Sequence, residues 1–573
     1  MKLKKLLAVM LVLAMSVSML TGCGTKKDDT TDDGAKEPEV TQAVDEPEAT
    51  QVPVEETVGE RAAYPGTLDA NAITINITSE PPEMFSVTMT DTTSFTVLRH
   101  VIENLVMLDA DDKVVPGVAT DWKASDDGLV YTFNLRQDMK WTNGEPVTAN
   151  DFVFAWTSLL TPSFASDYAY FGYIFKNGLA YNTGEVAADQ LGIKAVTDYQ
   201  LEVTLENPAS YFLSTLAFGV FAPVNEKAYK EFGEAYGTDA DKMVYNGPFK
   251  MTSWEHESNL VLEKNPDFYA ADKINLDKIT MVMINDTNAA MNSFKAGEVD
   301  VIGLNGDQVK MMKGESFPVF TYDDGSCFYL EFNTLDPQLA NVNLRTALTY
   351  AVDKQAFVDS IIKNNSKPAI SFTAPALNGL AGKFSDEVGP LVPTLDVAKA
   401  KEYYQKALTE LNVDTVSLTM ICDDTDTAVT NAAFIQEQLK VNLGIDLAVE
   451  SMPFKSRLDR MSNKDFSIVF AGWGPDYNDP MTYLDMFETG NGNNHTSYSS
   501  AAYDELLDKV RKELDPTTRF GYLMDLEKML MVDLPIGPVY WRSRDYILSG
   551  KIASGVVRTA FQDMNYRFVT LTQ

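Results

Sequence analysis

The sequence has few of the residue types that most often build metal sites and catalytic centres. Its 573 residues include only three histidines and three cysteines. His100, His256 and His495 share no short motif, and none of them belongs to an HExxH zinc pair. A GxSxG motif, which would mark a nucleophilic serine, is also missing from the sequence. We therefore expect no metal, no cofactor and no catalytic residue in this chain.

Positive charge is scarce as well. The chain has 47 lysines and arginines against 82 aspartates and glutamates, which gives a formal charge of -35. Such a surface repels polyanions, so we expect no nucleic acid partner. Hydrophobic residues make up 45% of the chain and aromatic residues 11%, which is ample for a folded globular protein of several domains.

Only one apolar run approaches the length of a membrane segment, and it lies near the N-terminus. The run "LLAVMLVLAMSVSML" (residues 6–20) follows the basic "MKLKK"; it is short for a bilayer span but typical of a secretion signal. It ends in "LTGC", which resembles the bacterial lipobox, where the signal is cut before a cysteine that becomes lipidated. We expect a signal peptide over residues 1–22, a lipidated Cys23, and a location on the extracytoplasmic face of the cell membrane. The alternative is an ordinary cleavable signal peptide.

The composition changes after the signal. Residues 24–63 are rich in Asp, Glu, Thr and Pro and contain no aromatic residue, so this stretch cannot bury enough apolar surface to offset chain entropy. We interpret residues 23–63 as a lipidated cysteine followed by a disordered acidic tether. Two cysteines remain in the folded body, Cys327 and Cys422. Export permits a disulfide between them, and two buried free thiols are the other interpretation.

The folded body shows both strand and helix patterns. Alternating or helically spaced apolar residues predict the following elements: a strand over Ala72–Ile77, a helix through Val97, Val101, Leu105 and Leu108, a turn and strand over 126–136, a helix capped by Thr148 and Asp151, a strand carrying Leu201, Val203 and Leu205, and a helix, glycine turn and strand around Gly444. Strands alternate with helices and also occur in hairpins, which indicates a mixed α/β protein in several lobes.

One loop near the C-terminus is a candidate binding site. The apolar strand "FSIVF" (466–470) runs into "AGWGPDYNDP" (471–480). This loop places the carboxylate of Asp476 beside aromatic groups at the mouth of a buried strand. Such a carboxylate can catalyse, bind a metal or meet a cation brought by a ligand. The structural alternative is an Asp that only caps the turn.

Several stretches together resemble one protein family. They are, in chain order, residues 114–156, "LGIKAVTDYQLEVTLENPASYF", "VYNGPFKMTSWEHESNLVLEKNPDFY", "MNSFKAGEVDV", "CFYLEFNT", "VNLRTALTYAVDK", "AGWGPDYNDP" and "LPIGPVYWRSR". This ordered set is similar to the extracytoplasmic solute-binding proteins of peptide ABC transporters, the oligopeptide-binding proteins of bacterial solute-binding protein family 5. The resemblance covers residues 64–573.

The resemblance implies an α/β fold, a two-lobed periplasmic-binding-protein-like clamshell of type II. Lobe I would comprise residues 64–325 plus 541–573, with an extra subdomain inserted at about 100–240, and lobe II would comprise 326–540. Ligand would be buried between the lobes as they close. The implied partners are a peptide and the permease subunits of an ABC transporter, with the membrane reached through the N-terminal lipid. The family also implies a monomer and no enzymatic activity.

The resemblance also assigns roles to single residues. Asp476 would pair with the α-amino group of the peptide, the one cation that every unblocked peptide carries. From the chemistry of the residues themselves, Trp473 would either wall the cleft and stack on the ligand or belong to the core, and Gly472 would let the ligand backbone approach and pair as an added strand. Tyr168 matches a tyrosine that faces the ligand, and an ordinary half-buried aromatic residue is the alternative. Tyr477, next to Asp476, is also expected to contact the ligand. Asp479 is expected to hold the turn of the loop.

The chain departs from well-known enteric members where they hold a peptide carboxylate. Two arginines of those members fall on Phe470 and Met461 here, so Phe470 would line the ligand site without a charge. Three alternatives then stay open: longer peptides, a modified C-terminus of the peptide, or a different cation such as Arg457 or Lys455.

Other functions remain open from the sequence alone. The same fold could carry a metal chelate, an opine or a sugar, or serve as a peptide-sensing receptor. An enzyme using Asp476 and Asp479 as acid and base is the remaining alternative.

Overall fold

The computed structural model describes residues 69–573, except 210, 559, 562–563 and 573. The predicted signal peptide, lipidated Cys23 and tether lie outside the described residues. All described residues belong to one unit, Val52–Gln573. Within them, no helix combines the length and the apolar character needed to cross a membrane.

Strands and helices alternate along the chain, as the sequence predicts. The strands are β1 Ala72–Asn76, β2 Val106–Leu108, β3 Val114–Pro116, β4 Ala119–Ala124, β5 Val130–Leu135, β6 Ile193–Thr197, β7 Gln200–Thr204, β8 Phe249–Glu255, β9 Asn259–Lys264, β10 Lys278–Val282, β11 Val301–Leu304, β12 Phe320–Phe332, β13 Lys367–Pro368, β14 Thr419–Asp423, β15 Ala448–Met452, β16 Ile468–Trp473, β17 Ile536–Leu548, β18 Ile552–Ser554 and β19 Thr570–Leu571. The α-helices are α1 Thr92–Val101, α2 Ala149–Leu160, α3 Gly178–Asn182, α4 Phe212–Thr215, α5 Glu226–Phe232, α6 Thr287–Lys295, α7 Gly306–Gly314, α8 Val342–Ala351, α9 Lys354–Phe357, α10 Phe384–Val388, α11 Val397–Leu411, α12 Asp426–Leu443, α13 Phe454–Ser462, α14 Met481–Leu484, α15 Ala501–Lys512 and α16 Pro516–Asp533.

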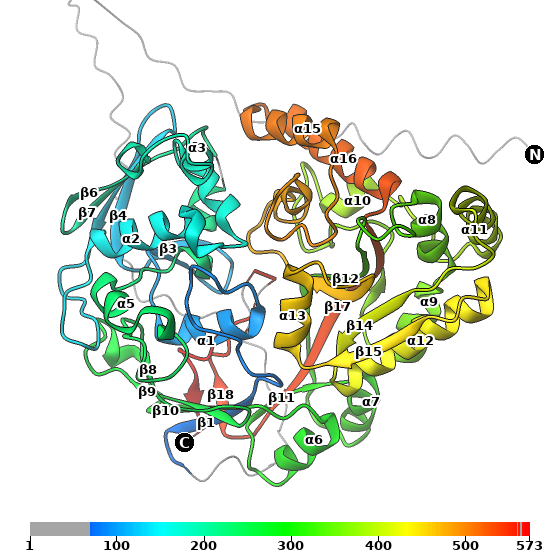
Figure 1. Cartoon of the computed structure of the whole chain (residues 1–573). Helices are drawn as coiled ribbons and strands as arrows, with labels where there is room; N and C mark the ends of the chain where they lie inside the picture. The colour runs from blue at the N-terminus through cyan, green and yellow to red at the C-terminus, as the bar shows by residue number, and fades with distance from the viewer. Residues whose placement is uncertain (1–68, 210, 559, 562–563, 573) are drawn as a thin grey trace, which may run out of the picture. The chain divides into compact units, whose positions relative to one another are not determined.

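One large mixed sheet runs through the protein (Figure 1). Its strand order is β15-β14-β16-β12-β17-β11-β1-β10-β9-β8, with β13 also paired to β17. The two longest strands, β12 and β17, have 13 residues each and pair with each other in the middle of this order. The C-terminal half of β12 also pairs with β16, while the C-terminal end of β17 pairs with β11. The predicted lobe boundaries at 325–326 and 540–541 fall within β12 and β17, and those boundaries stay a prediction.

A second sheet of four strands lies in the region predicted as the extra subdomain. Its order is β4-β5-β7-β6. Phe133, Leu201 and Val203 are buried, as the alternation predicts. Helix α2 begins after Thr148, whose backbone N–H donates to Asp151 Oδ2 at 2.7 Å, so the predicted capping interaction is confirmed.

One predicted helix is too long. The apolar spacing of Val97, Val101, Leu105 and Leu108 predicts a single helix, but α1 ends at Val101 and Leu108 belongs to β2. The chain turns extended at Ile102 (φ −123°, ψ 136°).

Tertiary contacts supply the reason for this early helix end. The Glu103 N–H donates to Asn246 Oδ1 at 2.9 Å, and the Glu103 carboxylate pairs with Arg567 at 2.7 Å. These buried polar contacts to distant segments override the local helical pattern.

The other predicted elements are confirmed within a few residues. They are β1, β7, β16, and the sequence of α12, a left-handed Gly444 (φ +73°) and β15. Cys327 and Cys422 are both buried and free, which decides the question that the sequence left open.

Candidate ligand-binding site

The loop that carries Asp476 is held at both ends by one threonine. Strand β16 pairs with β12, with Gly472 opposite Phe328, and then leaves the sheet before Pro475. Thr482, in the short helix α14, contacts both sides of the loop. Its carbonyl accepts from Trp473 Nε1 at 2.8 Å, and its hydroxyl accepts from the Asp476 N–H at 2.9 Å. The loop therefore has a defined conformation that fixes the direction of the Asp476 side chain.

The Asp476 carboxylate is buried and incompletely paired. The residue as a whole keeps part of its surface exposed, but its Oδ2 is buried and has no hydrogen-bond partner among the described residues. The carboxylate also accepts hydrogen bonds from the side chains of Thr482 and Tyr168. Burial, followed by the nearby Asp485 carboxylate, raises the pKa of Asp476 well above its usual value. No lysine or arginine in the described part of the chain acts as its counter-charge.

A small cavity adjoins this carboxylate. Its volume is about 40 Å³, and Asp476 forms one part of its wall. Most of the remaining wall is apolar and comes from α1, β2 and residues 217–219, including Phe95, Leu98, Met107 and Phe218. Since one water needs roughly 10–15 Å³ of such space, the cavity holds about three non-hydrogen atoms.

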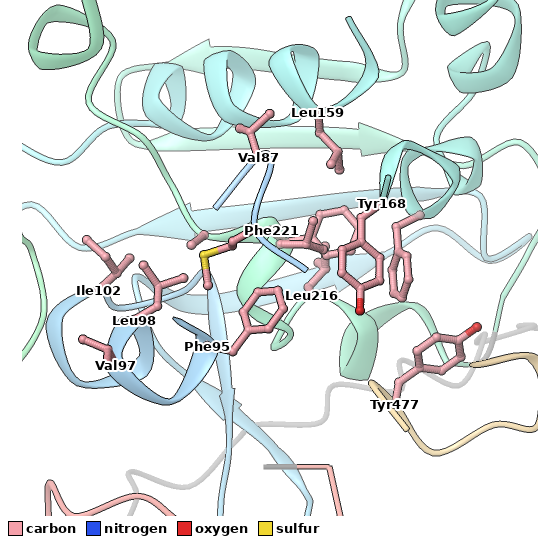
Figure 2. Packing of buried hydrophobic residues seen from close by; sticks show 14 of the residues in the cluster. Val87, Phe95, Val97, Leu98, Ile102, Leu159, Tyr168, Leu216, Phe221 and Tyr477 are labelled. Carbon is pink, nitrogen blue, oxygen red and sulfur yellow. The ribbon is translucent and has the colours of Figure 1, made fainter. Parts of the chain in front are cut away.

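Tyr168 connects the cavity wall to the Asp476 loop. Its side chain is buried, and its ring packs edge-on against Phe95 and Phe218 at centroid distances of 6.2 and 5.4 Å (Figure 2). The centroid of the Trp473 ring lies 6.2 Å from that of Tyr168. Burial raises the pKa of Tyr168 well above its usual value, so its hydroxyl stays protonated and donates to Asp476. Three predicted site residues, Asp476, Tyr168 and Trp473, are thus brought together.

Of the other predicted site residues, Gly472 is exposed, whereas the side chains of Phe470 and Tyr477 are buried. Gly472 is exposed, and a Cβ there would lie only 2.9 Å from the Phe328 ring. Phe470 is 6% exposed and packs against Phe328 and Phe357. Tyr477 is 4% exposed and stacks on Tyr211 at 5.4 Å. Ligand contacts by these three residues stay a prediction.

Comparison with known proteins identifies the family. The sequence profile of the bacterial extracellular solute-binding proteins, family 5 (middle region), matches residues 113–495, more than half of the chain. The chain belongs to family 5. Proteins of this family bind solutes for transport and are not enzymes, which confirms the predicted class of protein.

Relatives of this family 5 protein align over nearly its whole folded body. The oligopeptide-binding protein OppA of Bacillus subtilis is 35% identical over 514 residues, covering 86% of this chain and 92% of the relative. The dipeptide-binding protein DppE of the same organism is 32% identical and covers 88% of this chain and 93% of the relative.

Solved structures agree on the fold. The substrate-binding domain of an oligopeptide ABC transporter from Bacillus anthracis has a TM-score of 0.85 at 33% identity, and covers 88% of this chain and 99% of that chain. Listeria monocytogenes OppA bound to peptide has a TM-score of 0.84 at 34% identity, with the same coverage of both chains. These matches confirm the predicted α/β clamshell fold.

The sequence interpretation of this family 5 protein missed Asp485. The residue is 7% exposed, its Oδ1 has no hydrogen-bond partner among the described residues, and Tyr477 donates to its Oδ2 at a long 3.4 Å. Burial and the nearby Glu488 raise the pKa of Asp485 well above its usual value. The available signal was one acid inside the apolar stretch "MTYLDMF" (481–487). A single acidic residue within an apolar stretch indicates that its carboxyl group is buried together with that stretch.

Two charged residues near the loop are already paired. Asp479 Oδ1 accepts from the Met481 N–H at 3.0 Å, and both Asp479 oxygens accept from Arg519, so its predicted role in holding the turn is confirmed. Arg457 donates from Nε to Asp423 at 2.6 Å and from Nη1 to the Met461 sulfur at 2.9 Å. Arg457 would have to leave Asp423 to meet a ligand carboxylate.

Proposed function

We propose that this protein is a membrane-anchored, extracytoplasmic peptide-binding protein that captures oligopeptides by their amino ends and delivers them to an ABC permease. The observation that carries the proposal is the buried Oδ2 of Asp476, which has no partner among the described residues. A peptide ammonium is a suitable partner because it brings a full positive charge and three N–H donors to a site shielded from water.

The geometry supports recognition of the amino end independently of peptide sequence. Thr482 and Tyr168 already donate to the Asp476 carboxylate, which leaves the remaining oxygen for a ligand. The exposed backbone at Gly472, at the end of β16, suits main-chain pairing with an extended ligand. Both contacts involve groups that all unblocked peptides share.

The named relatives support a peptide as the ligand. One is an oligopeptide-binding protein, one solved neighbour holds a peptide, and a third is described as a peptide-binding pheromone receptor, PrgZ, with a TM-score of 0.84 at 28% identity. The last of these favours a peptide-sensing role as the second candidate function. Mass spectrometry of ligand released from the purified protein separates a peptide from a metal chelate, an opine or a sugar.

The test of the proposal compares peptides with free and acetylated amino ends. We expect wild-type protein to bind a pool of three- to six-residue peptides and to fail to bind the same pool after N-acetylation. Asp476→Asn should weaken binding of free peptides by about 2–5 kcal/mol, roughly 30- to 4,000-fold, because it removes one partner of a buried charge pair. The exposed Asp359→Asn is the control and should bind as the wild type does. Equal affinity of the wild type for both pools would overturn the proposal.

The location is proposed from the N-terminal sequence. A lipid on Cys23 and the acidic tether would keep the binding body near its permease while leaving it free to move. We expect Cys23→Ser to release the protein from the cell, as measured by its distribution between cells and medium. Sedimentation of the purified protein tests whether it is a monomer.

A further inference from the structure

A bulge in β12 lies directly beneath the Asp476 loop. The pairing of β12 with β17 shifts register between Asp323, opposite Ser543, and Cys327, opposite Trp541. Residues 324–326 of β12 therefore face a single residue of β17. On one side of the bulge, β17 also pairs with β11. On the other side, β12 also pairs with β16. Bulges at such positions redirect a strand and re-aim nearby groups.

The bulge touches the loop at Gly325. This glycine has φ +72°, and a Cβ built on it would lie 2.7 Å from Pro475 Cγ. Its carbonyl accepts a hydrogen bond from the Tyr483 hydroxyl, which comes from α14. Only a residue without a side chain permits this close approach of the bulge to Pro475, the residue before Asp476.

Charged groups hold the bulge in place. Asp324 is 7% exposed and accepts from Arg542 Nε at 2.7 Å and from Arg544 Nε at 2.6 Å. Arg542 also donates from Nη2 to Ser326 Oγ at 3.2 Å, and so contacts both ends of the bulge. A buried carboxylate with two guanidinium partners is a rigid anchor, since losing either partner leaves charge uncompensated.

We propose that this bulge positions the Asp476 carboxylate: Gly325 and Arg542 are positioning residues that hold Pro475, and through it Asp476, in line with the amino end of the peptide. The proposal rests on the function proposed above for Asp476. It adds that amino-end recognition depends on the central strand pair of the sheet, so a displacement of β12 against β17 moves the carboxylate.

The experiment is a double-mutant cycle between Gly325 and Pro475. Each purified protein is offered matched pools of free and N-acetylated three- to six-residue peptides, and native mass spectrometry measures the ratio of free to acetylated peptide captured. Gly325→Ala should lower this ratio at least tenfold because the new methyl group displaces Pro475. Adding Pro475→Ala removes the clashing ring atoms and should restore most of the ratio; Pro475→Ala alone completes the cycle.

A matched glycine separates positioning from backbone strain. Gly389 has nearly the same backbone angle (φ +73°) but no atom within 4 Å of a built Cβ, so Gly389→Ala should keep the wild-type ratio. A Gly325→Ala ratio equal to that of the wild type or unchanged by Pro475→Ala would overturn the inference.

If Gly325→Ala does not fold, Ser326→Ala serves instead. This variant removes the contact with Arg542 and should lower the ratio several-fold, and an unchanged ratio would overturn the inference. A wild type that captures both pools equally refutes the Asp476 function itself.

Discussion

At the scale of single residues, the site places two carboxyl groups where burial opposes their ionisation. The carboxyl groups of Asp476 and Asp485 are both buried, each has one oxygen without a partner among the described residues, and the Asp485 carboxylate raises the cost of ionising Asp476. Burying an unpaired carboxylate is unfavourable, so the ligand-free protein gives up stability at this site. A cationic ligand would recover that free energy on binding.

The first prediction concerns stability without ligand. The pKa of Asp476 in the folded protein is raised above its usual value. The stabilisation that protonated Asp476 gives the folded state is therefore complete below the pKa of the unfolded chain, and it is lost as pH rises through the folded-state pKa. Asp476→Asn should therefore raise the Tm of the ligand-free protein at pH 7, and raise it less near pH 4. We expect Tm to rise by about 1 °C or more. The shift is small because a change of 1 kcal/mol in the free energy of unfolding moves Tm by only about 2–4 °C in a chain of 150–250 residues, and by less in a longer chain. A lower Tm at pH 7 in differential scanning calorimetry would contradict this account.

The second prediction concerns pH and binding. A peptide ammonium requires ionised Asp476, and protonation of this carboxylate sets in at higher pH than for an ordinary Asp. Affinity should fall as pH is lowered through the raised pKa, and calorimetry in buffers of different ionisation enthalpy should detect protons released by the protein on binding. At high pH the affinity should fall again as the peptide amino group, with a pKa of about 8, loses its proton. An affinity independent of pH between 5 and 7 would count against a titrating Asp476.

The third prediction concerns Tyr168. Its hydroxyl donates to Asp476, and hydrogen bonds to charged groups contribute about 1.5–3 kcal/mol. Tyr168→Phe should weaken binding of free peptides roughly 10- to 150-fold and move the acid limb of the pH profile to higher pH. Tyr236→Phe is the control, because the Tyr236 hydroxyl is buried with no hydrogen-bond partner among the described residues. Titration calorimetry that finds the two variants equal would remove Tyr168 from the site.

At the scale of elements, the early end of α1 shapes the ligand site. Because the helix stops at Val101, residues 106–108 form β2 and contribute Met107 and Leu108 to the wall of the cavity beside Asp476. With Asp476 holding the peptide amino group as proposed, the first side chain of the peptide would have this apolar space within reach. Its small volume suits an aliphatic rather than an aromatic side chain.

The fourth prediction fills that cavity. Ala217 lines it, so Ala217→Leu should weaken binding of peptides that begin with Val at least several-fold, and affect peptides that begin with Gly less. Ala195 is similarly half-buried but lies in β6, and Ala195→Leu is the matched control. Equal losses for both peptide series, measured by calorimetry, would show that the first side chain lies elsewhere.

At the scale of the whole molecule, segments from the predicted extra subdomain and the predicted second lobe meet at Asp167. Its carbonyl accepts from Asn493 Nδ2 at 3.4 Å, and its carboxylate accepts from the Ser462 side chain. Gly492 packs so closely that a Cβ there would lie 2.4 Å from the Asp167 backbone. These contacts join the two segments and do not involve Asp476 directly.

The fifth prediction removes these contacts. The double variant with Ser462→Ala and Asn493→Ala should bind free peptides several-fold more weakly, since each hydrogen bond contributes about 0.5–1.5 kcal/mol. Its preference for free over acetylated peptides should stay at the wild-type value, because Asp476 is untouched. Asn463→Ala, an exposed neighbour with a local hydrogen bond to Asp459, is the control. A loss of the preference would mean that the Asp167 contacts also orient the carboxylate.

Most elements, the family and the candidate carboxylate can be predicted from the amino-acid order alone. Alternation in β5 and β7 and the glycine after α12 depend on neighbouring residues, so local patterns suffice to predict them. The ordered motifs that indicate Asp476 are also local patterns, so they can be recognised without knowledge of tertiary contacts.

Packing of the folded chain sets where α1 ends, that the two cysteines stay free, and which groups surround Asp476. Tyr168 and the bulge at Gly325 reach the Asp476 loop from distant parts of the chain. Asp485 affects Asp476 through the charge of its buried carboxylate. Such contacts depend on how strands and helices pack, which no local periodicity encodes, because burial and pairing are properties of the assembled core.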